Sequence, residues 1–117
     1  MTKTRRGEVV LVLFPNSDLR TAKRRPALVI QRNDLENGLA QTIIAMISSN
    51  LARRGHPSRI FVGVNSTAGK TAGLRLDSVN MADNLATVMD SEIDSVLGNF
   101  PEMNNVDAAL KHTFGLA

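Results

Sequence analysis

Two segments of the sequence place phosphate-binding side chains at the ends of apolar runs. Arg25 directly precedes the run PALVI, and Ser48 directly follows the run TIIAMI. A guanidinium fork held on a rigid strand suits bidentate phosphate recognition, and hydroxyl groups can bond phosphate oxygens or base edges. The pattern therefore indicates a phosphate-binding site. The alternative readings are a strand-end arginine in solvent and ordinary turn chemistry.

Two loops carry most of the positive charge. They span residues 16–25 (NSDLRTAKRR) and 50–59 (NLARRGHPSR), and residues 1–60 contain 11 Lys/Arg against 4 Asp/Glu. If the first four strands form a meander, both loops lie at the same end of the sheet. We therefore expect one polyanion-binding rim, with a merely solvated surface as the alternative. Its members would be Arg20, Lys23, Arg24, Arg25, Arg53, Arg54 and His56.

The elements that must position these residues are mostly strands. Runs that are apolar at successive positions predict strands buried on both faces, and hence a small, strongly bent barrel covered outside by a partner or a helix. The expected strands are residues 9–14, 27–30, 42–47 and 60–64, with two shorter ones, 78–82 and 85–88, joined tightly at Asp83–Asn84.

The C-terminal part changes its period. Apolar residues recur every three or four positions from Phe100 to Phe114, with Pro101 suited to the first turn and Gly115 to the end, which predicts an amphipathic helix. A shorter helix is expected at Ser91–Leu97, stopped by Gly98. The predicted fold class is α+β, mainly β: a small barrel of five to six twisted antiparallel strands with C-terminal helices, in one domain over residues 1–117.

Composition excludes several classes of site. There is no cysteine, and the two histidines, His56 and His112, are too few for a histidine-rich metal site. We expect His56 to be a surface residue or RNA contact and His112 to be solvated. The absence of cysteine fits a cytoplasmic protein. No apolar run approaches the length of a membrane span, and the N-terminus lacks a signal-peptide cleavage site. We expect no metal and no cofactor.

Residues 63–71 (GVNSTAGKT) approach the phosphate-cradling G-x-x-x-x-G-K-T loop, but Val64 stands where its first glycine should be. Gly73 follows Thr71 too closely for the helix that such a loop needs. The segment is therefore predicted to be a flexible polar surface loop.

The order of segments resembles the MazF/PemK (Kid) family of type II toxin–antitoxin ribonucleases. The resemblance is carried by RRGEVVLVLFP, KRRPALVIQ, IIAMISSN, GLRLDSVNMADNLATV and the last 25 residues, a Gly-stopped helix followed by M-x-x-[VI]-x-x-[AR]-L, over about residues 5–116. It implies an SH3-like barrel, a symmetric homodimer and a cognate MazE-like antitoxin. It also implies metal-independent, sequence-specific cleavage of single-stranded RNA, namely mRNA.

Carried over by position, the resemblance gives catalytic roles to Arg25 and Ser48. The 2′-OH of a ribose would attack its own 3′-phosphodiester and yield a 2′,3′-cyclic phosphate (or a 3′-phosphate) and a 5′-OH. The general base stays open between Asp83, His56 and phosphate-assisted transfer, because an arginine is a poor free base. The residues expected to bind RNA are Asn16, Lys23, Arg24, Ser49, Asn50, Arg53, Arg54, His56 and Asp83.

The sequence departs from the family mainly at positions of the PemK type of site, which has a second arginine and a loop histidine. The Arg25–Ser48 arrangement is intact, and we expect it to perform the chemistry. Two alternatives remain: a toxin of the CcdB kind that acts on gyrase, and a non-catalytic RNA-binding barrel. The departures are Leu13 for Asp, Leu19–Arg20 for Glu–Gln, and Met81 and Ala86 for Arg.

Overall fold

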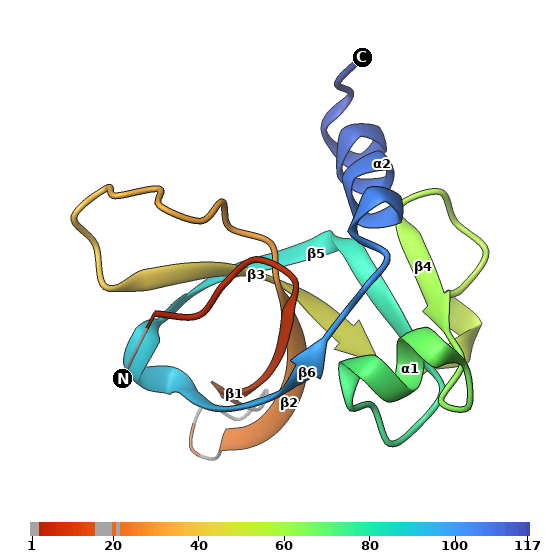
Figure 1. The fold of residues 1–117 in the computed structure, drawn as a ribbon, viewed down its shortest axis with the longest axis horizontal. Coiled ribbons are helices and arrows are strands. Elements are labelled where there is room, and N and C mark those ends of the chain that lie inside the picture. The colour runs from red at the N-terminus through yellow and green to blue at the C-terminus, as the bar shows by residue number, and fades with distance from the viewer. Residues whose placement is uncertain (1–2, 16–19, 21) are drawn as a thin grey trace.

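The protein is built on one six-stranded sheet in which every neighbouring pair of strands is antiparallel (Figure 1). The computed structural model describes residues 3–15, 20 and 22–117. The strand order is β4-β5-β3-β2-β1-β6. The strands are β1 Glu8–Pro15, β2 Ala22–Val29, β3 Gln41–Ser48, β4 Arg59–Val62, β5 Ser78–Met89 and β6 Ile93–Asn99.

Helices are short and few in the described residues. They are α1 Thr67–Ala72 and α2 Met103–Phe114, with the 3-10 turns η1 Leu51–Arg53 and η2 Asp90–Glu92. The expected α+β, mainly β class is confirmed, but α1 lies between β4 and β5 in the chain, so only α2 is C-terminal. No helix in this part of the chain is long and apolar enough to cross a membrane.

The apolar runs are buried on both faces because the curled sheet encloses two cores. Val9 and Leu28 belong to one core, with Ala72 of α1 and Val106 of α2, whereas Val10 and its neighbours belong to a second core formed by strands alone. Successive residues of one strand therefore alternate between two cores of the same chain. The chain itself therefore buries both faces of these strands, and the covering partner that the apolar runs suggested is not needed for them.

The expected meander ends at β3. Strand β5, not β3, is the neighbour of β4, and both β3 and β4 run antiparallel to β5. Strand β4 therefore runs in the same direction as β3, and the expectation that it runs back beside β3 is wrong. Apolar periodicity marks a strand but carries no information on which distant strand it pairs with.

The two short strands expected at residues 78–82 and 85–88 are one bent strand, β5. Its pairing with β3 shifts register, because Ala45 lies opposite Leu85 whereas the next residue, Met46, lies opposite Met81. Residues 82–84 are therefore extra residues in β5. Such an insertion bends a strand and increases its local twist.

Residues 67–72, expected to be part of a flexible loop, form α1 instead. The Ser66 side chain caps the helix, since its Oγ accepts the Gly69 N–H at 3.0 Å. Gly73 is the left-handed C-cap at φ 73°, so it ends the helix and does not forbid one. Ala68, Gly69 and Ala72 are buried, and their small side chains allow the helix to lie close to the sheet.

The helix expected at Ser91–Leu97 is wrong. After η2 the chain continues as β6, which pairs with β1 from Glu8–Asn99 to Val12–Ile93. The local sequence fits either element, and the free edge of β1 decides in favour of a strand. By contrast, the expected C-terminal helix is confirmed as α2, and it ends at Gly115 in the left-handed conformation.

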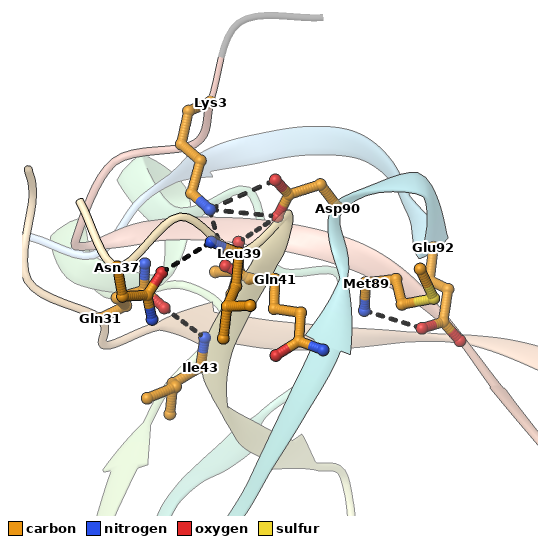
Figure 2. Close-up of polar contacts among 10 residues, drawn as sticks. Lys3, Gln31, Asn37, Leu39, Gln41, Ile43, Met89, Asp90 and Glu92 are labelled. Atoms are coloured by element: carbon orange, nitrogen blue, oxygen red, sulfur yellow. Dashed lines mark hydrogen bonds and ion pairs between the residues drawn. The ribbon is translucent and has the colours of Figure 1, made fainter. Parts of the chain in front are cut away.

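Polar contacts attach the N-terminal segment to the end of the sheet where β3 begins and β5 ends (Figure 2). Lys3 Nζ donates to the Gln41 carbonyl at 2.6 Å and lies 3.2 Å from Asp90 Oδ2. The same carboxylate accepts the hydroxyl of buried Thr42 at 2.6 Å. These contacts join the start of β3 to the turn after β5.

Gly98→Ala tests the close approach of β6 to α1. A Cβ at position 98 would overlap the carbonyl oxygen of Thr71 and lie 2.7 Å from the carbonyl carbon of Ala72. Both are backbone atoms that cannot rotate away, so we expect a loss of about 1–3 kcal/mol in the free energy of unfolding, measured by urea denaturation.

Gly63→Ala is the matched control, because its Cβ would meet only side-chain atoms at 3.9 Å. A Gly98→Ala protein as stable as the Gly63→Ala protein would contradict this account of the packing.

Candidate active site

The pairing of β2 with β3 brings Arg25 near Ser48. The ladder runs through Val29–Ile44, Leu28–Ala45 and Ala27–Met46. Pro26 has no N–H and cannot extend it, but the same register continued by two residues sets Arg25 opposite Ser48. Adjacent strands lie about 5 Å apart, so the two side chains can reach one ligand.

Both residues line a cavity of about 630 Å³ at this end of the sheet. Its walls come from the start of β2, the end of β3, η1, the segment after α1 and β5. Five cations line it, and no carboxylate does among the described residues, so the cavity favours an anion. The polar lining residues are Lys23, Arg24, Arg25, Ser48, Ser49, Asn50, Arg53, Arg75, Ser78 and Asn84.

The Ser48 hydroxyl is oriented by the turn that follows it. Its Oγ accepts the Asn50 N–H at 3.1 Å, which leaves the hydroxyl hydrogen for another acceptor. The Asn50 side chain in turn accepts the Ala52 N–H at 3.2 Å and caps η1. The residue that ends η1, Arg53, lines the cavity.

Of the residues predicted to bind RNA, Lys23, Arg24, Ser49, Asn50 and Arg53 lie at this cavity together with the predicted catalytic pair. Arg24 also forms an ion pair with β6, since its Nε lies 3.5 Å from Asp94 Oδ2. The two side chains of that ion pair are 61% and 44% exposed, so the attraction is weak and an incoming anion can compete with it.

Three predicted residues do not line the cavity. Arg54 lies over the Phe61 ring, 5.5 Å from its centroid, and His56 packs edge-on against His112 at 5.7 Å. The expectation that His112 is merely solvated therefore misses a contact. Asp83 forms an ion pair with Arg59. The prediction of one rim assumed that all side chains of a basic loop face the same way. Successive side chains of a turn point in different directions, as Arg53 and Arg54 do.

The structure also bears on Asn16, a predicted RNA contact, and on Arg20, a predicted member of the rim. Asn16 lies outside the described residues, so its predicted place is not assessed. Arg20 does not line the cavity.

The Asp83 carboxylate is held by a forked contact. Arg59 Nε and Nη2 donate to its two oxygens at 3.3 and 2.8 Å. These hydrogen bonds, more than the accompanying charge attraction, lower the pKa of Asp83, and they raise the pKa of Arg59. A carboxylate with a lowered pKa is a weaker base, and Asp83 does not face the cavity. His56, the other candidate base, accepts the Ser58 N–H on its Nδ1 at 3.1 Å.

Sequence reasoning missed three polar residues of the cavity, Arg75, Ser78 and Asn84. Arg75 stands in GLRLDS, where the chain leaves α1, and Asn84 stands in the bulge of β5. Arg75 is an isolated cation without a charge run, and the usual signals did not mark it. The apolar part of the wall comes from Leu11, Pro26, Met46, Ile47, Leu74, Leu76, Met81 and Leu97. Within the described residues, no group of three or more His, Cys, Asp or Glu could hold a metal ion.

Fold and cavity together define a small, mainly β protein with a cationic, hydroxyl-bearing site for an anion. Residues 5–114 match the family described as PemK-like, MazF-like toxin of type II toxin-antitoxin system, and the chain belongs to this family.

Individual relatives and solved structures support the same family assignment. The chain is 33% identical over 107 residues to endoribonuclease MazF2 of Mycobacterium bovis, covering 89% of this chain and 90% of that protein. Its fold resembles a mycobacterial endoribonuclease solved in complex with its cognate antitoxin, with a TM-score of 0.74, 23% identity and 98% of each chain covered. A second mycobacterial endoribonuclease gives a TM-score of 0.72 at 25% identity, covering 99% of this chain and 95% of that one.

Asp83→Asn should lower stability in a pH-dependent way. The pKa of Asp83 is lowered in the folded state, so its ionised form stabilises the fold above the unfolded-state pKa of about 3.9, and this contribution is lost as the pH falls through the folded value. We expect the variant to unfold at lower urea than the wild type at about pH 7, with the difference narrowing below about pH 4.

Glu36→Gln, which removes a carboxylate from an exposed loop, controls for net charge. A difference for Asp83→Asn that stays constant from neutral to acidic pH would contradict a stabilising ion pair.

Proposed function

We propose that this protein is the toxin of a type II toxin–antitoxin system and cleaves single-stranded mRNA as a sequence-specific endoribonuclease. The observation that carries the proposal is that Arg25 and Ser48 line one cavity together with further cations. Family membership and the endoribonuclease names of its relatives support the same activity.

In the proposed mechanism the 2′-oxygen of a ribose attacks the adjacent phosphorus, and the bond from phosphorus to the 5′-oxygen breaks. The 2′-hydroxyl loses its proton and the leaving 5′-oxygen gains one, giving a 2′,3′-cyclic phosphate and a 5′-OH. The Arg25 fork stabilises the charge that develops on the phosphorane oxygens. Ser48 donates its hydroxyl hydrogen to the same group, since its Oγ already accepts from Asn50.

Proposed partners follow from the relatives and the charge of the site. One structural relative was solved with its cognate antitoxin. An acidic antitoxin segment would compete with RNA for the cations of the cavity. We also propose a homodimer in the cytoplasm, supported by large apolar side chains left exposed in the described chain, among them Leu76, Phe114 and Leu116. Sedimentation at micromolar concentration tests the dimer.

The chemistry is tested with a labelled RNA of mixed sequence. Arg25→Ala should lower the cleavage rate about 10²- to 10³-fold, because it removes the stabilisation of the phosphorane. Arg25→Lys should restore little, since an ammonium cannot hold two oxygens in one plane. Ser48→Ala should cost less than Arg25→Ala, and Ser48→Thr should be nearly neutral.

Two substrate conditions complete this test. Cleavage should persist in EDTA, because the substrate carries its own nucleophile, and should stop when the cleaved position carries 2′-deoxyribose. Cleavage of the 2′-deoxy substrate would refute the mechanism. RNA bound but left intact would favour a non-catalytic RNA-binding protein, and gyrase inhibition without RNA cleavage would favour a toxin with a protein target.

Salt dependence should separate the cations that face the cavity from those that do not. Each phosphate contact contributes about −0.7 to the slope of log K against log salt for a single strand. We expect Arg53→Gln and Arg75→Gln each to flatten the slope by about 0.7, and Arg54→Gln to leave it unchanged because Arg54 lies on Phe61.

Arg54→Gln is thus the matched neighbour of Arg53→Gln, with the same charge removed one residue away. Equal slopes for these two variants would place the RNA elsewhere.

A further inference from the structure

One guanidinium outside the cavity joins two parts of its wall. Arg59, at the start of β4, uses Nε and Nη2 to hold the Asp83 carboxylate, and its Nη1 donates to the carbonyl oxygen of Arg53 at 3.1 Å. Both side chains of the ion pair are only 27% exposed. Arg59 itself is not part of the cavity wall.

Each segment that Arg59 holds presents a residue to the cavity. Arg53, the acceptor of one bond, is the last residue of η1, and its side chain lines the cavity. Asp83, the acceptor of the other two, precedes Asn84, which also lines it. Both segments lie outside the regular ladder, because η1 is a single turn and residues 82–84 form the bulge of β5. A side-chain contact can therefore decide their positions.

We propose that Arg59 is a positioning residue that fixes Arg53 and Asn84 in the arrangement in which the cavity binds RNA. This inference rests on the proposed function, which supplies the RNA. Arg25 and Ser48 stand on β2 and β3 and receive no hydrogen bond from Arg59, so its loss should weaken RNA binding and leave the cleavage step intact.

The kinetic test compares Arg59→Gln with Arg32→Gln, which removes an equal charge from an exposed loop at the other end of the β2–β3 pair. We expect Arg59→Gln to raise KM about tenfold with kcat within about twofold of the wild type, and Arg32→Gln to change neither. Arg59→Lys should share most of the increase, because one ammonium cannot replace the fork and the bond to Arg53. A wild-type KM in Arg59→Lys would mean that Arg59 contributes only its positive charge, and would overturn the proposal.

A double-mutant cycle then tests whether Arg59 acts through Arg53. In an Arg53→Gln background, Arg59→Gln should raise KM by a clearly smaller factor than in the wild type, since part of what it positions is already gone. Independent effects that multiply would mean that Arg59 does not act through Arg53, and would overturn the proposal for that residue. If Arg59→Gln does not fold, Asp83→Asn, which keeps one acceptor oxygen, should raise KM by a smaller factor.

A measurement without RNA separates this inference from the proposed function. The amides of Arg53 and Arg54 donate to the carbonyls of Asn50 and Leu51, and their hydrogen exchange reports the order of η1. Exchange at these amides should accelerate in Arg59→Gln and not in Arg32→Gln. Unchanged exchange would refute positioning by Arg59 whatever the activity, whereas a wild-type protein that leaves RNA intact would refute the proposed function alone.

Discussion

The bend of β5 is the constraint on which the geometry of the cavity depends. Three extra residues, 82–84, separate the half of β5 that pairs with the start of β3 from the half that pairs with its end and with β4. Because the bent half inserts between β3 and β4, the loop between those strands must cross over it. That crossing sets η1 above one side of the cavity, while the bulge itself supplies Asn84 on another.

The sheet can curl this tightly because its two faces enclose separate apolar cores and because a few positions lack side chains. Val9 and Val10 show the first condition, since they point into different cores. Gly98 shows the second, where β6 approaches the backbone of α1. The segment that leaves α1 then reaches the cavity and brings Arg75 to it. A short helix of small residues thereby connects the packing of the sheet to the charge of the site.

Most of the ion pairs in the described part of the chain are formed by residues that do not line the cavity. Lys3, Arg6 and Arg59 pair with Asp90, Asp107 and Asp83, and each pair ties elements that are distant in the sequence. The cations of the cavity repel one another, and among the described residues only Arg24 of the five has a carboxylate partner. Such a cluster costs stability in the free protein and is offset when an anion binds.

The sequence by itself determined strands β1 to β5, with β5 predicted in two pieces, and the C-terminal helix, because apolar periodicity is a local feature. It also marked Arg25 and Ser48, which line one cavity. It did not determine residues 67–72 and 93–99, whose local pattern fits more than one element. Only the tertiary structure decided which strand lies beside β4. It also decided that Arg53 lines the cavity whereas the next residue, Arg54, lies over Phe61. Pairing between distant strands and the direction of a side chain in a turn depend on long-range contacts, and no local pattern of residues encodes them.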